Sequence, residues 1–243
     1  MKEKAIPYLQ MPTTDGLSVA EINEPFVDIF AYGKGEILVD MQYEKACREG
    51  AISTAFLRKE VADRLLQASK NLPRGYRLKI FDAWRPYAVQ KSLYDEYFNR
   101  LKEENPTLAE EELHKKARTF VSFPDKTEKA SYVHSSGGAV DLTIVDENGV
   151  ELDMGTPFDD FSAQSLTSAL EKTDGEEMAK GNRRLLYGAM IKAGFTNYPS
   201  EWWHYDFGDL FWAAATGNPV RYLSVYTQEE MKMENDDGGE IKL

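Results

Sequence analysis

The pattern of apolar and polar positions in the first part of the chain predicts a helix, a strand and a second helix. Residues 53–72 carry apolar side chains at the spacing of one helix face, after a Ser-Thr pair that can cap the first turn. Residues 76–80 alternate between apolar and charged side chains, as in a strand with one buried face. Pro86 suits the first turn of a helix that continues to Leu101.

The same patterns predict two further strands and another helix. The apolar run at residues 138–146 indicates a strand that ends in a turn, after which residues 150–152 can return as a hairpin partner. Asn182 can cap a helix that ends at Gly194, where a left-handed cap is expected. Residues 202–207 are aromatic and typical of a strand.

These elements fit one domain that comprises residues 1–243. The chain shows no repeat, and no Gly/Ser-rich or Pro-rich linker divides it. Strands and helices alternate without a regular βαβ rhythm, so we expect an α+β fold with a small antiparallel sheet flanked by helices. The polar residues 103–130 are expected to form a surface excursion with a short helix near 109–120, and residues 231–243 a flexible acidic tail.

The charge and composition narrow the classes of partner. A formal net charge of −12 without a local basic patch disfavours nucleic acids and anionic membranes. No stretch approaches the ~18 apolar residues of a membrane span, and no apolar segment of an export signal follows the N-terminus. The single cysteine, Cys47, excludes an internal disulfide and is expected to be a small buried side chain rather than a reactive thiol. We therefore expect a cytoplasmic protein; the composition leaves the oligomeric state open.

Candidate chemistry centres on two of the three histidines. His114 lies in a charged helical stretch and is expected to be a solvated surface residue. His134 precedes a turn and the strand that carries Asp141, whereas His204 lies in the later strand. If the two strands are neighbours, two imidazoles and one carboxylate can form a three-ligand zinc site that leaves one position for water. Glu201 can then act as the base if the chain bends just before the strand; otherwise these residues are ordinary core or surface residues.

The order of these residues resembles a known family. The segment His134–Asp141 has the form His-x-x-Gly-x-Ala-x-Asp, and Glu201–His204 has the form Glu-x-x-His. This pair of motifs resembles the signatures of the D-alanyl-D-alanine dipeptidases, the VanX family of zinc peptidases. The resemblance covers residues 55–210. Further segments agree in kind and in order: Asp82–Pro86, Met154–Asp159, and Asn182–Leu185 leading into Gly194–Phe195.

The resemblance implies a DD-peptidase/hedgehog-like zinc fold and a role for each matching residue. His134, Asp141 and His204 would bind one zinc ion per chain, and Glu201 would be the general acid/base. Arg85 would stabilise the transition state, since a permanently charged guanidinium can face the scissile carbonyl oxygen. A plain salt bridge at the start of a helix remains the alternative for this arginine.

Two further positions concern the substrate. Asp159 matches a family position beside the substrate amino terminus, although a turn or a cap would also explain an aspartate there. Tyr132 departs from the family, whose members usually carry a small hydroxyl residue two positions before the first zinc-binding histidine. We expect this change to affect substrate contacts or pocket width more than hydrolysis itself.

These expectations give one leading function and two alternatives. The leading function is zinc-dependent hydrolysis of short D,D-dipeptides, chiefly D-Ala-D-Ala, with a small dipeptide as the substrate and neither nucleic acid nor membrane as a partner. The first alternative is a D,D-carboxypeptidase that acts on cell-wall stem peptides. The second is a zinc-binding module without catalysis.

Overall fold

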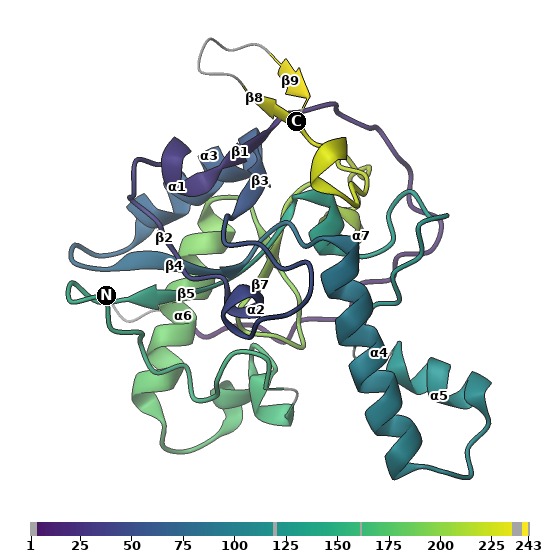
Figure 1. The fold of residues 1–243 in the computed structure, drawn as a ribbon. Coiled ribbons are helices and arrows are strands. Elements are labelled where there is room, and N and C mark those ends of the chain that lie inside the picture. The colour runs from purple at the N-terminus through teal and green to yellow at the C-terminus, as the bar shows by residue number, and fades with distance from the viewer. Residues whose placement is uncertain (1–3, 119–120, 161, 235–239, 243) are drawn as a thin grey trace.

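A computed structural model describes residues 4–118, 121–160, 162–234 and 240–242. Its central element is a five-stranded sheet in the order β2-β4-β5-β7-β6 (Figure 1). The β2 strand pairs parallel with β4, and all other pairs are antiparallel. The strands are β2 (Leu38–Val39), β4 (Arg77–Asp82), β5 (Ala139–Val145), β7 (His204–Asp206) and β6 (Thr196–Asn197).

The register of the middle strands brings candidate residues together. Asp141 in β5 lies opposite His204 in β7 on one side and opposite Asp82 in β4 on the other. The β4–β5 ladder is irregular between Ile80 and Asp82, just before β4 ends. The two strands expected to carry His204 and Asp141 are therefore direct neighbours.

A second sheet joins the two ends of the chain in the order β3-β1-β8-β9. Its strands are β3 (Phe56–Arg58), β1 (Phe26–Asp28), β8 (Lys232–Glu234) and β9 (Glu240–Lys242). The β8 strand pairs parallel with β1 and antiparallel with β9. Within the segment expected to be a flexible tail, residues 232–234 and 240–242 form strands of this sheet, whereas residues 235–239 and 243 lie outside the described residues.

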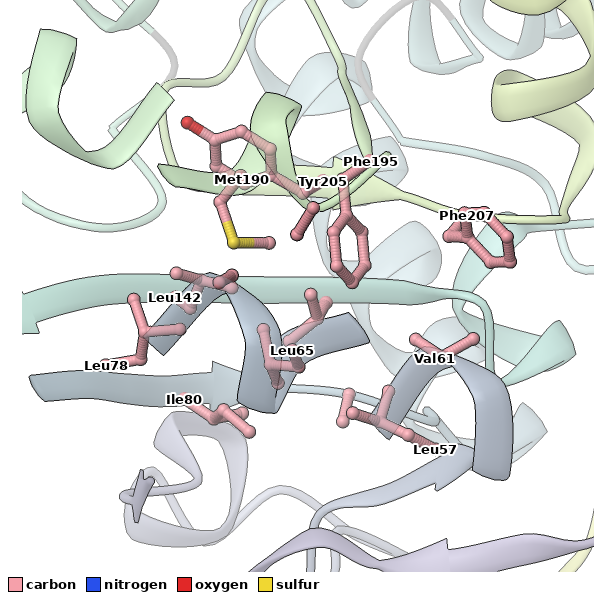
Figure 2. Packing of buried hydrophobic residues seen from close by; sticks show 14 of the residues in the cluster. Leu57, Val61, Leu65, Leu78, Ile80, Leu142, Met190, Phe195, Tyr205 and Phe207 are labelled. Atoms are coloured by element: carbon pink, nitrogen blue, oxygen red, sulfur yellow. The ribbon is translucent and has the colours of Figure 1, made fainter. Parts of the chain in front are cut away.

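The main core lies between the five-stranded sheet and the helices α3 (Lys59–Asn71) and α6 (Glu177–Lys192), which contact each other. Figure 2 shows side chains from β3, α3, β4, β5 and β7 meeting in this core. The predicted helix at residues 53–72 begins only at Lys59, because Phe56 and Leu57 lie in β3 and pair with β1. These components confirm the α+β class and add a second sheet to it.

The predicted helix at Asn182 begins earlier than expected. The α6 helix already starts at Glu177, so Asn182 lies inside it and donates from its side chain to the backbone C=O of Asp153. Its end agrees with the prediction: Gly194 has a φ of +94°, and a Cβ there would lie 2.6 Å from a guanidinium nitrogen of Arg64.

The polar excursion and the shorter helices lie outside this core. In Figure 1, α4 and α5 extend away from the sheets, as expected for residues 103–130. His114 is half-buried there, with its ring stacked 4.3 Å from that of Phe98.

The single Cys47 is exposed rather than buried, because α2 ends before it and its φ is +53°. No helix within the described ranges is long and apolar enough to cross a membrane. The remaining helices are α1 (Ile29–Tyr32), α2 (Gln42–Lys45), α4 (Tyr87–Glu104), α5 (Glu110–Ala117), α7 (Leu210–Thr216), and the 3₁₀ turns η1 (Val133–Ser136), η2 (Ala163–Ser165), η3 (Ala169–Lys172) and η4 (Gln228–Glu230).

Candidate active site

His134 lies in η1, immediately before the turn that leads into β5. Gly137 in this turn has a φ of +74°, and a Cβ there would lie 2.3 Å from the ring of Phe26. Both observations require glycine at this motif position. The Nδ1–H of His134 donates to the backbone C=O of Ala83 at 2.7 Å, so the lone pair of Nε2 faces the interior of the site.

His204 begins β7 and is oriented by a carboxylate that the sequence analysis did not single out. Its Nε2–H donates to Oδ1 of Asp206 at 2.7 Å, so Nδ1 is the ring nitrogen that faces Asp141 and would bind a cation. Residues two apart in a strand share a face, so this spacing was a usable signal for Asp206. Carboxylates in this position fix the tautomer and the orientation of metal-binding histidines.

Asp206 has a second buried carboxyl beside it, that of Asp209. Burial, together with the charge of Asp206, raises the pKa of Asp209 well above its usual value. The Oδ2 atoms of both residues are buried and have no donor among the described residues, so a proton held on Asp209 would satisfy both. The Oδ1 atom of Asp209 accepts from the backbone N–H of Trp212 and caps α7.

The ligand atoms of His134, Asp141 and His204 converge, and all lie within 4.8 Å of one another. His134 Nε2 lies 3.2 Å from His204 Nδ1 and 3.3 Å from Asp141 Oδ2, and His204 Nδ1 lies 2.9 Å from Asp141 Oδ1. Tetrahedral zinc with bonds of about 2.0–2.1 Å requires ligand separations of about 3.3 Å. The three side chains therefore already have a spacing close to that which such an ion needs.

Glu201 lies in a turn just before β7, so the expected bend is present. Its backbone N–H donates to the C=O of Tyr198 at 3.1 Å, and its Oε2 lies 3.9 Å from His204 Nδ1. Burial, together with the charges of Asp141 and Asp159, raises the pKa of Glu201 to about 8. A bound cation would oppose this shift, so more of the carboxylate would be ionised near neutral pH and available to act as a base.

Arg85 lies where β4 leads into α4, and it contacts the same group. Its Nε donates to Asp82 Oδ2 at 2.8 Å and its Nη1 to Gln90 Oε1 at 2.8 Å, while its Nη2 lies 3.4 Å from Asp141 Oδ2. Its guanidinium carbon lies 4.8 Å from the ring centroid of Tyr43. The salt bridge considered as an alternative is thus present, and it holds the guanidinium beside the candidate ligands.

Asp159 and Tyr132 line the same cavity but differ in their contacts. Asp159 has a φ of +59°, and its Oδ2 accepts from the hydroxyl of Tyr43 at 3.0 Å. Burial, followed by the charge of Asp141, raises the pKa of Asp159 to about 6. Tyr132 is buried and donates its hydroxyl to the backbone C=O of Arg85 at 3.0 Å.

One cavity of about 260 Å³ contains the whole group. All seven candidate residues line it, together with residues that the sequence analysis did not propose, among them Tyr43, Arg48, Gln90 and Phe211. The first two come from the part of the chain that precedes the resembling segments, so the motifs gave no signal for them.

Comparisons with known proteins agree with this geometry. Residues 45–222 match the family described as D-ala-D-ala dipeptidase. The chain belongs to this family. It is 29% identical to a D-alanyl-D-alanine dipeptidase of Synechocystis sp. over 85% of this chain and 89% of that protein. It is 31% identical to a D-alanyl-D-alanine dipeptidase of Enterococcus faecium over 62% of this chain and 72% of that protein.

Family membership confirms the prediction that the chain is a zinc metallopeptidase, and the structure contains a His-Asp-His group that could hold the metal ion. A solved structure of a mutant of VanY, a vancomycin resistance D,D-pentapeptidase in complex with Zn(II), has 16% sequence identity and a TM-score of 0.42. That comparison covers 71% of this chain and 85% of the other.

Proposed function

We propose that this dipeptidase-family enzyme hydrolyses short D,D-dipeptides, chiefly D-Ala-D-Ala, with one zinc ion held by His134, Asp141 and His204. The observation that supports this most is the convergence of these three ligand atoms within 4.8 Å, beside the half-buried Glu201. The names of the relatives, all D-alanyl-D-alanine dipeptidases, support the choice of substrate. The cytoplasmic location and the exclusion of nucleic acids stay predictions.

The bound ion would supply Lewis acidity, which acidifies water and polarises the scissile carbonyl. Two imidazoles and one carboxylate suit a divalent ion, and the two nitrogens that would bind it, His134 Nε2 and His204 Nδ1, lie 3.2 Å apart. No other group of three or more His, Cys, Asp or Glu in the described parts of the chain meets this spacing.

Glu201 would carry the proton during hydrolysis. Its carboxylate takes a proton from the attacking water and then delivers it to the nitrogen of the leaving amino acid. Arg85 faces the negative charge that develops on the carbonyl oxygen, and its contacts with Asp82 and Gln90 hold it in place before the substrate arrives. Asp159 would pair with the ammonium group of the substrate, because its carboxylate lies in the same cavity.

The test is D-Ala release by the purified enzyme from D-Ala-D-Ala, with zinc content measured on the same sample. Glu201→Gln should lower kcat by about 10²–10⁴-fold, because it removes the general base, while zinc content stays near one per chain. His204→Ala should lose zinc and activity together, because two protein ligands make a poor site. The matched control is Glu147→Gln, an exposed glutamate in the turn after β5, which should keep both. Wild-type activity in Glu201→Gln would overturn the assigned base.

The carboxypeptidase alternative differs in how it treats the amino terminus. The carboxylate of Asp159 in the cavity favours a free ammonium group, so N-acetyl-D-Ala-D-Ala and an acylated pentapeptide should be poor substrates. Equal rates on free and acylated peptides would favour a carboxypeptidase. Stoichiometric zinc without cleavage of either peptide would favour the non-catalytic module.

A further inference from the structure

A second arginine lines the cavity beyond the residues assigned above. Arg48 follows α2 in a tight turn: its N–H donates to the C=O of Tyr43 at 3.0 Å, and its C=O accepts from the N–H of Ala51 at 3.1 Å. This turn places Tyr43 and Arg48 in the lining of one cavity with Asp159. The turn precedes both motifs in the chain. Arg48 is not among the residues assigned to zinc binding or proton transfer.

The guanidinium of Arg48 is only partly neutralised. Its Nη2 lies 2.7 Å from Glu96 Oε2 and its Nη1 lies 3.4 Å from Ser92 Oγ. The Glu96 side chain is 67% exposed, whereas that of Arg48 is 23% exposed. An ion pair with such an exposed carboxylate is weak and is easily exchanged for a better one. The Nε atom of Arg48 is buried and lacks an acceptor among the described residues.

This arrangement suits a carboxylate from the substrate. A guanidinium presents paired N–H groups that match the two oxygens of a carboxylate, and the terminal nitrogens of Arg48 contact only the exposed Glu96 and the Ser92 hydroxyl. Two other cavity groups that could serve already have partners. Arg85 contacts Asp82, Gln90 and Asp141, and the hydroxyl of Tyr132 donates to the backbone C=O of Arg85.

The position of Arg48 also fits the length of a dipeptide. Tyr43 contacts Asp159 through its hydroxyl at 3.0 Å, and its ring centroid lies 5.9 Å from the guanidinium carbon of Arg48. One tyrosine side chain therefore separates an anionic from a cationic group. The two charged ends of a dipeptide are separated by a similarly short span, because consecutive Cα atoms are about 3.8 Å apart.

We propose that Arg48 binds the C-terminal carboxylate of the substrate and so restricts the enzyme to peptides with a free carboxyl end. This inference rests on the proposed dipeptidase function and adds a specificity-determining residue to it. Asp159 and Arg48 then recognise opposite ends of the same zwitterion, and a peptide extended or blocked at its carboxyl end lacks the second contact.

The experiment compares D-Ala-D-Ala with its C-terminal amide, which has the same scissile bond but no carboxylate. For wild type, Arg48→Gln, Arg48→Lys and Arg74→Gln, we would measure kcat and KM on the dipeptide and the inhibition constant of the amide against it. Arg74 is exposed in the loop before β4 and does not line the cavity, so it is the matched control. Arg48→Gln should raise KM for the dipeptide about 10–100-fold, leave kcat within about threefold, and leave the inhibition constant of the amide unchanged. Arg48→Lys should recover part of the lost affinity for the dipeptide, because it keeps the positive charge but not the paired N–H groups of a guanidinium.

Three results would overturn the proposal. One is a wild-type KM for the dipeptide in Arg48→Gln, and another is an equal loss of dipeptide and amide affinity, which indicates a structural role. The third is a larger KM effect in Arg100→Gln, since Arg100 also lines the cavity but is exposed over the ring of Tyr97. Failure of the dipeptidase function itself is distinguishable, because wild type would then not cleave D-Ala-D-Ala at all.

Discussion

The carboxylate behind His204 gives a prediction that can be worked through quantitatively. Asp206→Ala removes the acceptor of the 2.7 Å bond from His204 Nε2–H, and that nitrogen belongs to a side chain only 5% exposed. A buried donor left without an acceptor costs about 1–3 kcal/mol. Loss of an outer partner of a metal-binding histidine typically weakens metal affinity 10–100-fold, equivalent to about 1.4–2.7 kcal/mol. The first cost lowers the free energy of unfolding and the second weakens metal binding, so we expect the zinc dissociation constant of Asp206→Ala to rise about 10–100-fold.

The assay is a competition titration of zinc against a chelator of known affinity, followed by kcat at saturating zinc. Because Asp206 contacts no candidate substrate group, kcat at saturation should stay within about tenfold of wild type. The matched control is Asp209→Asn, whose amide supplies an N–H beside Asp206 and whose oxygen can still cap α7. Zinc affinity in this variant should stay within about threefold. Wild-type affinity in Asp206→Ala, or an equal loss in Asp209→Asn, would refute this account of how His204 is held.

Three further predictions concern stability. Gly137→Ala should lower the free energy of unfolding, measured in urea titrations, by about 2–5 kcal/mol. The added Cβ strains the backbone at a φ of +74° and would lie 2.3 Å from the ring of Phe26. A loss under 1 kcal/mol would contradict this. Leu65→Ala, at a side chain with no exposed surface, should cost about 2–5 kcal/mol and the neighbouring half-buried Leu66→Ala clearly less; equal losses would argue against the described core. Saturation with zinc at about a thousandfold its dissociation constant should add about 4 kcal/mol, which for a chain of this size raises Tm by roughly 8–16 °C over the chelator-treated protein; an unchanged Tm would argue against a bound ion.

The parts of the site that follow from sequence are those encoded at short range. The His134 and Asp141 motif predicts a turn and a strand, and its glycine marks the one backbone geometry that the turn needs. Pairing of this strand with the one that carries His204 completes the ligand group, so two local patterns and one pairing were enough.

What sequence reasoning missed depends on distant pairing. Tyr43 and Arg48 reach the cavity only because the chain near β2 is placed beside β4, which no local pattern encodes. Phe56 and Leu57 fit a helical face equally well, and only pairing with β1 selects the strand. Cys47 fits a helix by composition, yet its φ of +53° places it in an exposed turn.

The parallel pairing of β1 with β8 sets the order in which the molecule can be completed. Phe26 and Met233 are register partners although almost the whole chain lies between them. During synthesis, β1 can pair with β3, but its other edge stays unpaired until β8 has left the ribosome. Contacts of such long range form late and slowly. Until then, this open edge is the part of the nascent chain where a chaperone or another copy of the chain would most readily attach.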